Sequence, residues 1–183
     1  MTTTNNQPFL TDVKELRRRA REQMDKGAVT QDYGLDAKQA VAVLQNALAT
    51  DIVCVLRYTM HSIAATGINS QGAKDEFAQH AEEEKGHMEQ IAERINQLGG
   101  TPDFSPEGLA SRSASEYGKH ELDLVGMIKE NLIAERIAIE HYRELIAYFG
   151  EKDSTTRTML EEILAVEEEH ANDMADLLSA HAG

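Results

Sequence analysis

The spacing of hydrophobic residues along the chain predicts four long amphipathic helices. Apolar residues recur every three or four positions in four segments, which is the period of one helix face. These segments cover about 37–65, 70–98, 114–149, and from Asp153 or Ser154 nearly to the end. Asp36 is the expected N-cap of the first, and Gly99-Gly100 and Gly150 mark the ends of the second and third. The first and third links are short, which predicts two antiparallel helix hairpins.

The remaining segments complete an all-α design. The stretch "TPDFSPEGLASRS" is long enough to let the second hairpin cross the bundle before it starts. We therefore expect a four-helix bundle over residues 36–183. Residues 1–35 form an N-terminal extension, in which 1–8 read as a flexible tail and about 11–26 as a short helix. The apolar stripe of that short helix consists of Leu10, Val13, Leu16, Ala20 and Met24.

Composition agrees with this helical reading. The only three prolines, Pro8, Pro102 and Pro106, fall outside the predicted helices, and hydrophobic residues make up 41% of the chain. The single Cys54 excludes internal disulfides and a cysteine-based zinc site. The polar start lacks an apolar leader, and no run is expected to span a membrane. A soluble cytoplasmic protein is the expectation.

The charge of the chain favours cations as partners. The formal net charge is −14, which argues against a surface that binds nucleic acid throughout. Residues 1–35 carry six basic and five acidic residues, so the excess of acid belongs to the bundle.

Acidic residues interrupt the apolar stripe of every predicted helix. The stretches "HAEEEKGHMEQ" and "AVEEEHANDM" each place Glu-x-x-His on an otherwise apolar face, as Glu84/His87 and Glu167/His170. Residues three apart share a helix face, so each pair aims a carboxylate and an imidazole at one point. Single carboxylates occupy core-facing positions of the other two helices, as Asp51 and Glu135.

The two hairpins repeat the same pattern. Asp51 precedes Glu84 by 33 residues, and Glu135 precedes Glu167 by 32. One Glu-x-x-His is a weak signal, because it occurs by chance on solvated helices. Two of them, each preceded at nearly equal distance by an inward carboxylate, are far more specific. The alternative is an acidic surface whose register differs by one position.

Buried carboxylates require neutralisation. Four without partners would cost several kcal/mol each, and the same faces offer few basic residues. Two metal ions would neutralise them, and carboxylate with imidazole suits iron or manganese. Di-iron carboxylate bundles use this arrangement. The expected ligands are Glu84 and Glu167 as bridges, Asp51 with His87 at one metal, and Glu135 with His170 at the other.

Over about 37–178 the sequence resembles the bacterioferritins and related ferritin-like proteins. The resemblance lies in "LATDIVCVLRYTMHS", "EEEKGHMEQIAERINQLGGTPDF", "ENLIAERIAIEHYRELI" and "MLEEILAVEEEHANDM". In that family a helix carboxylate, a Tyr seven residues later and a His three beyond recur, and Asp51, Tyr58 and His61 match them. The resemblance implies a ferritin-like bundle with ferroxidase activity. Fe(II) would be oxidised by O2 or H2O2, and ferric mineral would collect inside a hollow homo-oligomeric shell.

The chain departs from the bacterioferritin pattern in four places. Asp51 replaces the usual Glu and is one methylene shorter. Lys85 stands where the family has its haem-ligating Met, so haem is not expected. The chain ends 13 residues after His170, without the family's fifth helix. This favours a dodecameric shell, as in the DNA-protecting mini-ferritins (Dps), over a shell of 24 subunits. The N-terminal 35 residues are additional.

Several side chains remain open to more than one reading. Tyr58 is either an electron donor or hydrogen-bond partner at the metals, or a core tyrosine with a satisfied hydroxyl. His80 is either an additional iron site or, more simply, a solvated helix histidine, and His61 and His141 are treated alike. No function is expected for three further residues, His120, His181 and Cys54.

Two other classes of function compete with iron storage. The first is a non-storing di-metal enzyme, either a rubrerythrin-like peroxidase or a manganese catalase. A rubrerythrin usually has an additional four-cysteine iron domain, which a chain with one cysteine cannot form. The second is a structural or DNA-compacting bundle, in which the cluster "RRRAR" at 17–21 would bind DNA phosphates. Acidic residues interleaved with these arginines weaken the DNA-binding hypothesis, and the same helix could instead dock its apolar stripe on a neighbouring subunit. The native metal, the oxidant and mineral formation stay open.

Overall fold

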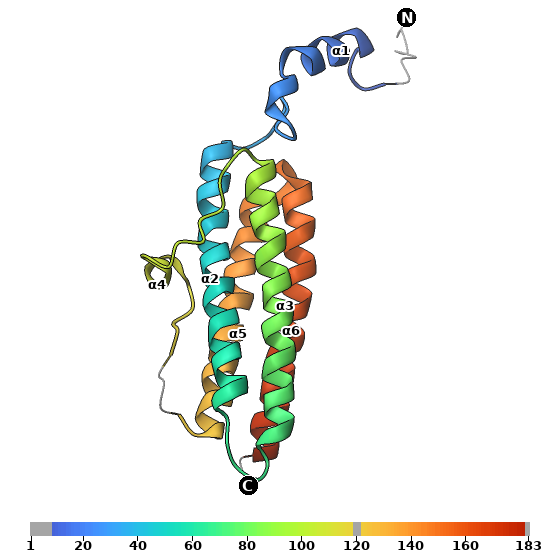
Figure 1. Cartoon of the computed structure of the whole chain (residues 1–183). Helices are drawn as coiled ribbons and strands as arrows, with labels where there is room; N and C mark the ends of the chain where they lie inside the picture. The colour runs from blue at the N-terminus through green and yellow to red at the C-terminus, as the bar shows by residue number, and fades with distance from the viewer. Residues whose placement is uncertain (1–8, 119–121, 182–183) are drawn as a thin grey trace, which may run out of the picture.

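The structure is a computed structural model that describes residues 9–118 and 122–181, and within those ranges all regular secondary structure is helical. Four long helices run side by side as a bundle, which confirms the predicted fold class (Figure 1). The helices are α1 (Val13–Glu22), α2 (Ala37–Ala64), α3 (Ser70–Gln97), α4 (Leu109–Arg112), α5 (Leu124–Phe149) and α6 (Ser154–His181). Short 3-10 turns occupy Met24–Lys26 and Gly150–Lys152. The tail at 1–8 and His120 lie outside the described residues.

Helix ends follow the expected capping chemistry in most places. Asp36 caps α2 by accepting a hydrogen bond of 2.9 Å from the backbone N–H of Gln39. Gly99 and Gly150 both have positive φ, at 82° and 44°, which ends α3 and α5. The predicted start of the third helix at 114 is wrong, because α5 begins only at Leu124. Gly118, with φ of 89°, interrupts a helix there, and Asp123 supplies the actual cap to Gly126.

The long connection crosses the bundle as the sequence predicted, and it contains the short helix α4, which was not expected. It runs beside α2 from one end of the bundle to the other (Figure 1). Buried Arg57 of α2 secures it by donating to the carbonyl of Glu116 at 2.7 Å. The Thr50 hydroxyl accepts from the backbone N–H of Ala114 at 2.9 Å. These bonds compensate polar groups that the crossover would otherwise bury.

The apolar core has two parts. One lies toward the end of the bundle where α2 begins, and the other toward the end where α2 finishes. The first includes Leu44, Leu48, Ile91, Ile95, Phe149, Leu160 and Ile163. The second includes Tyr58, Phe77, Met127, Ile128 and Met174. Along every long helix, the acidic residues highlighted above fall between these two parts.

Helix α2 is long and apolar enough to cross a membrane by length and composition alone. Half of its most apolar window is buried inside the bundle, where it packs chiefly on α3. Its hydrophobicity is therefore explained by its central place in the core, and no membrane protein is indicated.

The N-terminal extension projects beyond one end of the bundle (Figure 1). Helix α1 is shorter than predicted and carries only Val13, Leu16 and Ala20 of the predicted apolar stripe. Leu16 and Met24 remain 42% and 79% exposed. Tyr33 joins the extension to the bundle through a 2.8 Å hydrogen bond from its hydroxyl to Asp153. Docking of the stripe on a neighbouring subunit stays a prediction.

Asp153 is the polar anchor of this end of the bundle. It caps α6 through the Thr156 backbone N–H at 2.9 Å and pairs with buried Arg94 of α3 at 3.0 Å. Burial alone would raise the pKa of Asp153, but hydrogen bonds from Thr156, Tyr33 and Arg94 lower it. Its stabilising contribution is therefore present above the ordinary carboxyl pKa and is lost as the pH falls through the lowered, folded-state value.

We predict that Asp153→Ala lowers the free energy of unfolding by about 3–5 kcal/mol, because it leaves Arg94 charged and unpaired in a buried position. Urea denaturation of parent and variant at neutral pH measures this loss. Glu151→Gln, which removes an exposed ion pair with Arg157, is the matched control and should change stability by about 1 kcal/mol or less. Equal effects of the two substitutions would contradict the assignment.

Candidate metal centre

All six predicted ligands lie in the middle of the bundle, between the two parts of the apolar core. None is more than 5% exposed, so the alternative of an acidic surface in shifted register is wrong. Each long helix contributes: Asp51 from α2, Glu84 and His87 from α3, Glu135 from α5, and Glu167 and His170 from α6. The i, i+3 spacing places each Glu-x-x-His pair on the inward face of its helix.

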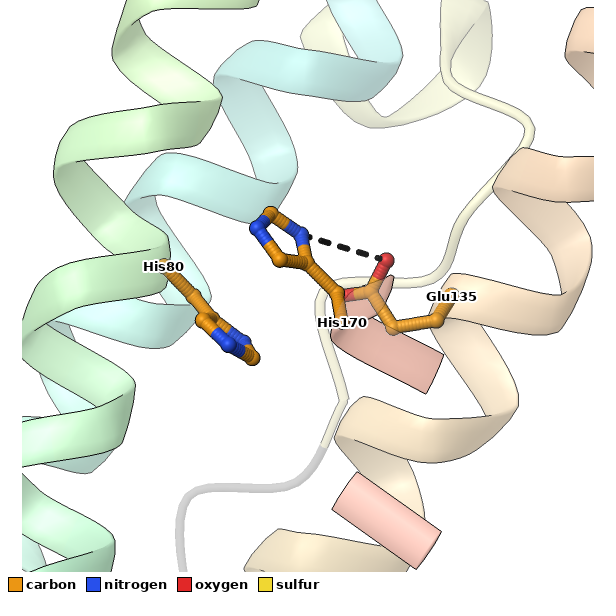
Figure 2. A group of neighbouring side chains, drawn as sticks. All are labelled: His80, Glu135 and His170. Atoms are coloured by element: carbon orange, nitrogen blue, oxygen red, sulfur yellow. Dashed lines mark ion pairs between the residues drawn. The ribbon is translucent and has the colours of Figure 1, made fainter. Parts of the chain in front are cut away.

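Four of these residues form one tight cluster. Each of Glu84, Glu135, Glu167 and His170 offers a ligand atom, and these atoms all lie within 4.8 Å of one another. The Nδ1 atom of His170 is 3.7 Å from Glu167 Oε2, 3.9 Å from Glu135 Oε2 and 4.0 Å from Glu84 Oε1. Figure 2 marks the contact between His170 of α6 and Glu135 of α5. One metal ion could sit at this convergence.

The fifth residue, His87, faces the other oxygens of the same two glutamates. Its Nδ1 is 3.0 Å from Glu167 Oε1 and 3.8 Å from Glu84 Oε2. Glu84 and Glu167 thus each turn one oxygen toward His170 and the other toward His87. This is the disposition that two bridging carboxylates need between two metal ions.

Asp51 lies at the edge of this group. Its Oδ1 accepts a 2.7 Å hydrogen bond from the Tyr142 hydroxyl, and its Oδ2 points into the buried interior. Burial first, and then the charges of Glu84 and Glu167, raise the pKa of Asp51 well above its usual value. Asp51, like His87, lies outside the tightest cluster of four.

The centre has an unusual concentration of buried polar atoms without hydrogen-bond partners among the described residues. Native proteins satisfy the large majority of such atoms, since leaving them unpaired is costly. The unpaired atoms include Asp51 Oδ2, both oxygens of Glu84 and of Glu167, Glu135 Oε2, and Nδ1 of His87 and of His170. Every predicted ligand is represented, and the oxygen–nitrogen set suits iron or manganese. The residues present therefore fit the metal pair that the sequence predicted.

Electrostatics in the centre favour the binding of cations. Burial and the charge of neighbouring glutamates raise the pKa of Glu84 and of Glu135. Burial acts to lower the pKa of His87, but the adjacent Glu167 and Glu84 raise it to about 10. In the metal-free protein, protons on the imidazoles therefore offset part of the carboxylate charge. Metal ions would displace those protons.

Two tyrosines hold the carboxylates in a crossed arrangement. Tyr58 of α2 donates to Glu135 of α5, while Tyr142 of α5 donates to Asp51 of α2. Each tyrosine lies seven residues after the carboxylate of its own helix and binds the carboxylate of the other. Sequence reasoning considered Tyr58 but missed Tyr142, although the repeated spacing of seven was a readable signal. Such outer partners fix the orientation of ligands.

Glu83 is a second residue that sequence reasoning missed. Its carboxylate lies 2.8 Å from Nε2 of His170, which turns Nδ1 of that ring toward the centre. The corresponding residue in the other hairpin is Val166, so His87 has no equivalent partner at that position. The abundance of acids around each Glu-x-x-His hid this asymmetry in the sequence.

The expectation of solvated histidines is wrong for three residues. His80 and His61 are buried, and His141 is half-buried. The ring of His80 stacks on that of His170 with centroids 3.9 Å apart, and in the view of Figure 2 His170 lies between His80 and Glu135. Burial, followed by the charge of His170, lowers the pKa of His80 to about 4. His61 contacts Asn131 Oδ1 at 3.2 Å, next to Arg57.

Fold and centre together define a helical bundle whose core is divided by buried carboxylates and imidazoles. The chain belongs to the ferritin-like family, since the model of the ferritin-like domain matches residues 41–181.

Individual relatives agree with this family. The DNA protection during starvation protein of Pyrococcus furiosus is 28% identical over 148 residues, which cover 80% of each chain. The nutrient stress-induced DNA-binding protein of a Synechococcus strain is 30% identical over 138 residues, covering 74% of this chain and 78% of that one. The bacterioferritin-related protein of Bacteroides fragilis, a dodecameric thioferritin, is 30% identical, with a TM-score of 0.78 and coverage of 92% and 95%.

We predict that Glu84→Gln leaves the metal-free protein as stable as the parent or more so, because it removes one of several repelling buried carboxylates. The same variant should lose the stabilisation that metal bound at the centre gives. In the parent this gain would be about 2.7 kcal/mol at a metal concentration 100 times the dissociation constant. Thermal unfolding with and without Co(II) tests both statements. Glu82→Gln, an exposed neighbour on α3, is the control. A full metal-induced gain in Glu84→Gln would count against the centre.

Proposed function

We propose that this protein is a ferroxidase that oxidises Fe(II) at a two-iron centre within each subunit and stores the ferric product inside a hollow homo-oligomer. One observation carries the proposal. Glu84 and Glu167 each direct one oxygen toward His170 and the other toward His87, and none of these four oxygens has a hydrogen-bond partner among the described residues.

The substrate is Fe(II), and the centre holds two ions side by side. Two Fe(II) ions together release two electrons as they become Fe(III). Those electrons, with two protons, reduce one O2 to H2O2, or one H2O2 to two molecules of water. Carboxylates favour the ferric product because they are hard anionic ligands. Manganese fits the same ligands and is the alternative metal.

The chain's own residues position the ligands and guide the substrate. Tyr58 and Tyr142 fix one oxygen of Glu135 and of Asp51, which leaves the other oxygen of each for iron. A cleft of about 210 Å³ between α3 and α6 leads from the surface to His87 and His170. Acidic side chains line this cleft and would attract Fe(II). They are Glu83, Glu169 and Asp173.

Support for a closed shell comes from the relatives, because the single chain carries no information on assembly. The dodecameric assembly of the Bacteroides fragilis protein, which this chain matches over almost its full length, supports twelve subunits. A shell of 24 subunits is the alternative, and sedimentation analysis separates the two by mass. Haem is not part of the proposal, since Lys85 is solvent-exposed and pairs with Glu82.

Aerobic titration of the metal-free protein with Fe(II), followed by ferric absorbance, tests the proposal. We expect fast oxidation from the first two Fe(II) per chain that continues far beyond that ratio. The Glu84→Ala/Glu167→Ala double variant should lose the fast phase, because both bridging ligands are gone. Glu82→Gln/Glu162→Gln changes two exposed acids on the same two helices and should oxidise iron as the parent does.

Other outcomes would favour a different function. Oxidation that stops at two Fe(II) per chain would indicate a non-storing di-metal peroxidase. Rapid O2 release from H2O2 by the Mn(II)-loaded protein, without mineral, would indicate a manganese catalase. Equal oxidation by the parent and the double variant would refute the centre.

DNA binding is the second candidate, because the names of two relatives refer to DNA. In this chain, however, intramolecular ion pairs engage two arginines of the cluster, Arg18 and Arg19. Arg18 pairs with Glu15 and Glu22, while Arg19 pairs with Glu15 and Asp32. We therefore predict no gel retention of duplex DNA at about 0.15 M salt, where surface attractions are screened. Retention that Arg17→Gln/Arg21→Gln abolishes would reverse this prediction.

A further inference from the structure

A second group of metal-ligand side chains lies on the surface of α3 and α6, beside the centre. Glu76 and His80 are one turn apart on α3, and Asp173 faces them from α6; their ligand atoms lie within 4.8 Å of one another. His80 Nε2 is 3.3 Å from Glu76 Oε1 and 3.5 Å from Asp173 Oδ2. The two carboxylates are 31% and 39% exposed, whereas the imidazole is fully buried.

Hydrogen bonding fixes which atom His80 presents to this group. The Tyr58 hydroxyl donates to Glu135, and His80 Nδ1 lies 3.2 Å from the same hydroxyl oxygen. With Nδ1 directed at Tyr58, the ring presents Nε2 to Glu76 and Asp173. That buried Nε2 has no hydrogen-bond partner among the described residues.

Three possible metal-ligand atoms thus converge at one point. One imidazole nitrogen and two carboxylate oxygens at this spacing form a donor set that a cation can occupy. We propose that Glu76, His80 and Asp173 form a third metal-binding site, distinct from the central pair, for a divalent first-row transition metal. One nitrogen and two oxygens suit Fe(II), Mn(II), Co(II) or Zn(II), and the exposed side leaves room for water ligands.

The internal repeat of the chain indicates that Glu76, His80 and Asp173 are not part of the repeated pattern that forms the central ligand set. Glu84 and Glu167 are equivalent positions of the repeat and lie 83 residues apart. By the same offset, the positions equivalent to Glu76, His80 and Asp173 in the opposite hairpins are Met159, Ile163 and Gln90. No side chain of this second set is a carboxylate or an imidazole. The two halves of the protein share the central ligands but not this group, so it has its own basis in the sequence.

The proposed site contacts the centre through the imidazole ring of His80. This ring stacks on His170 and hydrogen-bonds to Tyr58, whose hydroxyl donates to Glu135. A cation on Nε2 would fix the ring orientation and thereby the contact between Nδ1 and Tyr58. The binding inference itself is independent of iron oxidation.

Equilibrium dialysis of the metal-free full-length protein against Co(II), without oxygen, tests the site. We expect the parent to bind one more Co(II) per chain than the Glu76→Gln/Asp173→Asn double variant. The control, Glu93→Gln/Glu162→Gln, loses the same charge from exposed positions on the same helices and should bind as the parent does. An anomalous-scattering peak beside His80 Nε2, at about 2.0–2.2 Å, should be present in crystals of the parent and absent in the double variant.

Equal Co(II) binding by the parent and the Glu76→Gln/Asp173→Asn variant would overturn the proposal, as would an equal loss in the control. The Glu84→Ala/Glu167→Ala variant separates this inference from the ferroxidase proposal. It should lose the central ions and keep the third. If the central pair fails to bind in the parent while the third site binds, the proposed function falls and this inference stands.

Discussion

The structure depends on burying four carboxylates and two imidazoles at the middle of an apolar bundle. This burial is unfavourable in the bare chain, since it strips water from groups that then repel each other. The two parts of the apolar core, on either side, supply the packing that holds the helices together despite this cost. Cations bound at the proposed centre would offset this repulsion and would stabilise the least favourable region of the fold.

The sequence was sufficient for the fold and for the identity of the buried charges. Helical periodicity, the paired glycines and the repeat of Glu-x-x-His are local signals, and each survives in the structure. The late start of α5 was not predictable from periodicity, because the sequence from 114 reads as helical, whereas Gly118 has a positive φ and Arg57 binds the carbonyl of Glu116. That tie links residues 59 positions apart, which no local pattern contains.

Side-chain partnerships across helices were the harder part of the site. The burial of His80 depends on α6 packing over α3, and its stacking on His170 joins two helices that are distant in sequence. Glu83 is indistinguishable from its acidic neighbours until the helix orientation is known. Tyr142 is different, since its spacing from Glu135 repeats that of Tyr58 from Asp51 and could have been read in advance. Comparing the two copies of the repeat would therefore have identified Tyr142 as a partner of a buried carboxylate, as Tyr58 is.

The crossed tyrosines make the two hairpins dependent on each other. Tyr58 and Tyr142 each stabilise a carboxylate that belongs to the opposite hairpin, so neither half of the bundle carries a complete set of supported ligands. If one hairpin separates, both carboxylates lose their support at once. The two metal positions should therefore form and disappear as one cooperative unit, and a half-assembled centre that releases reactive iron would be a short-lived state.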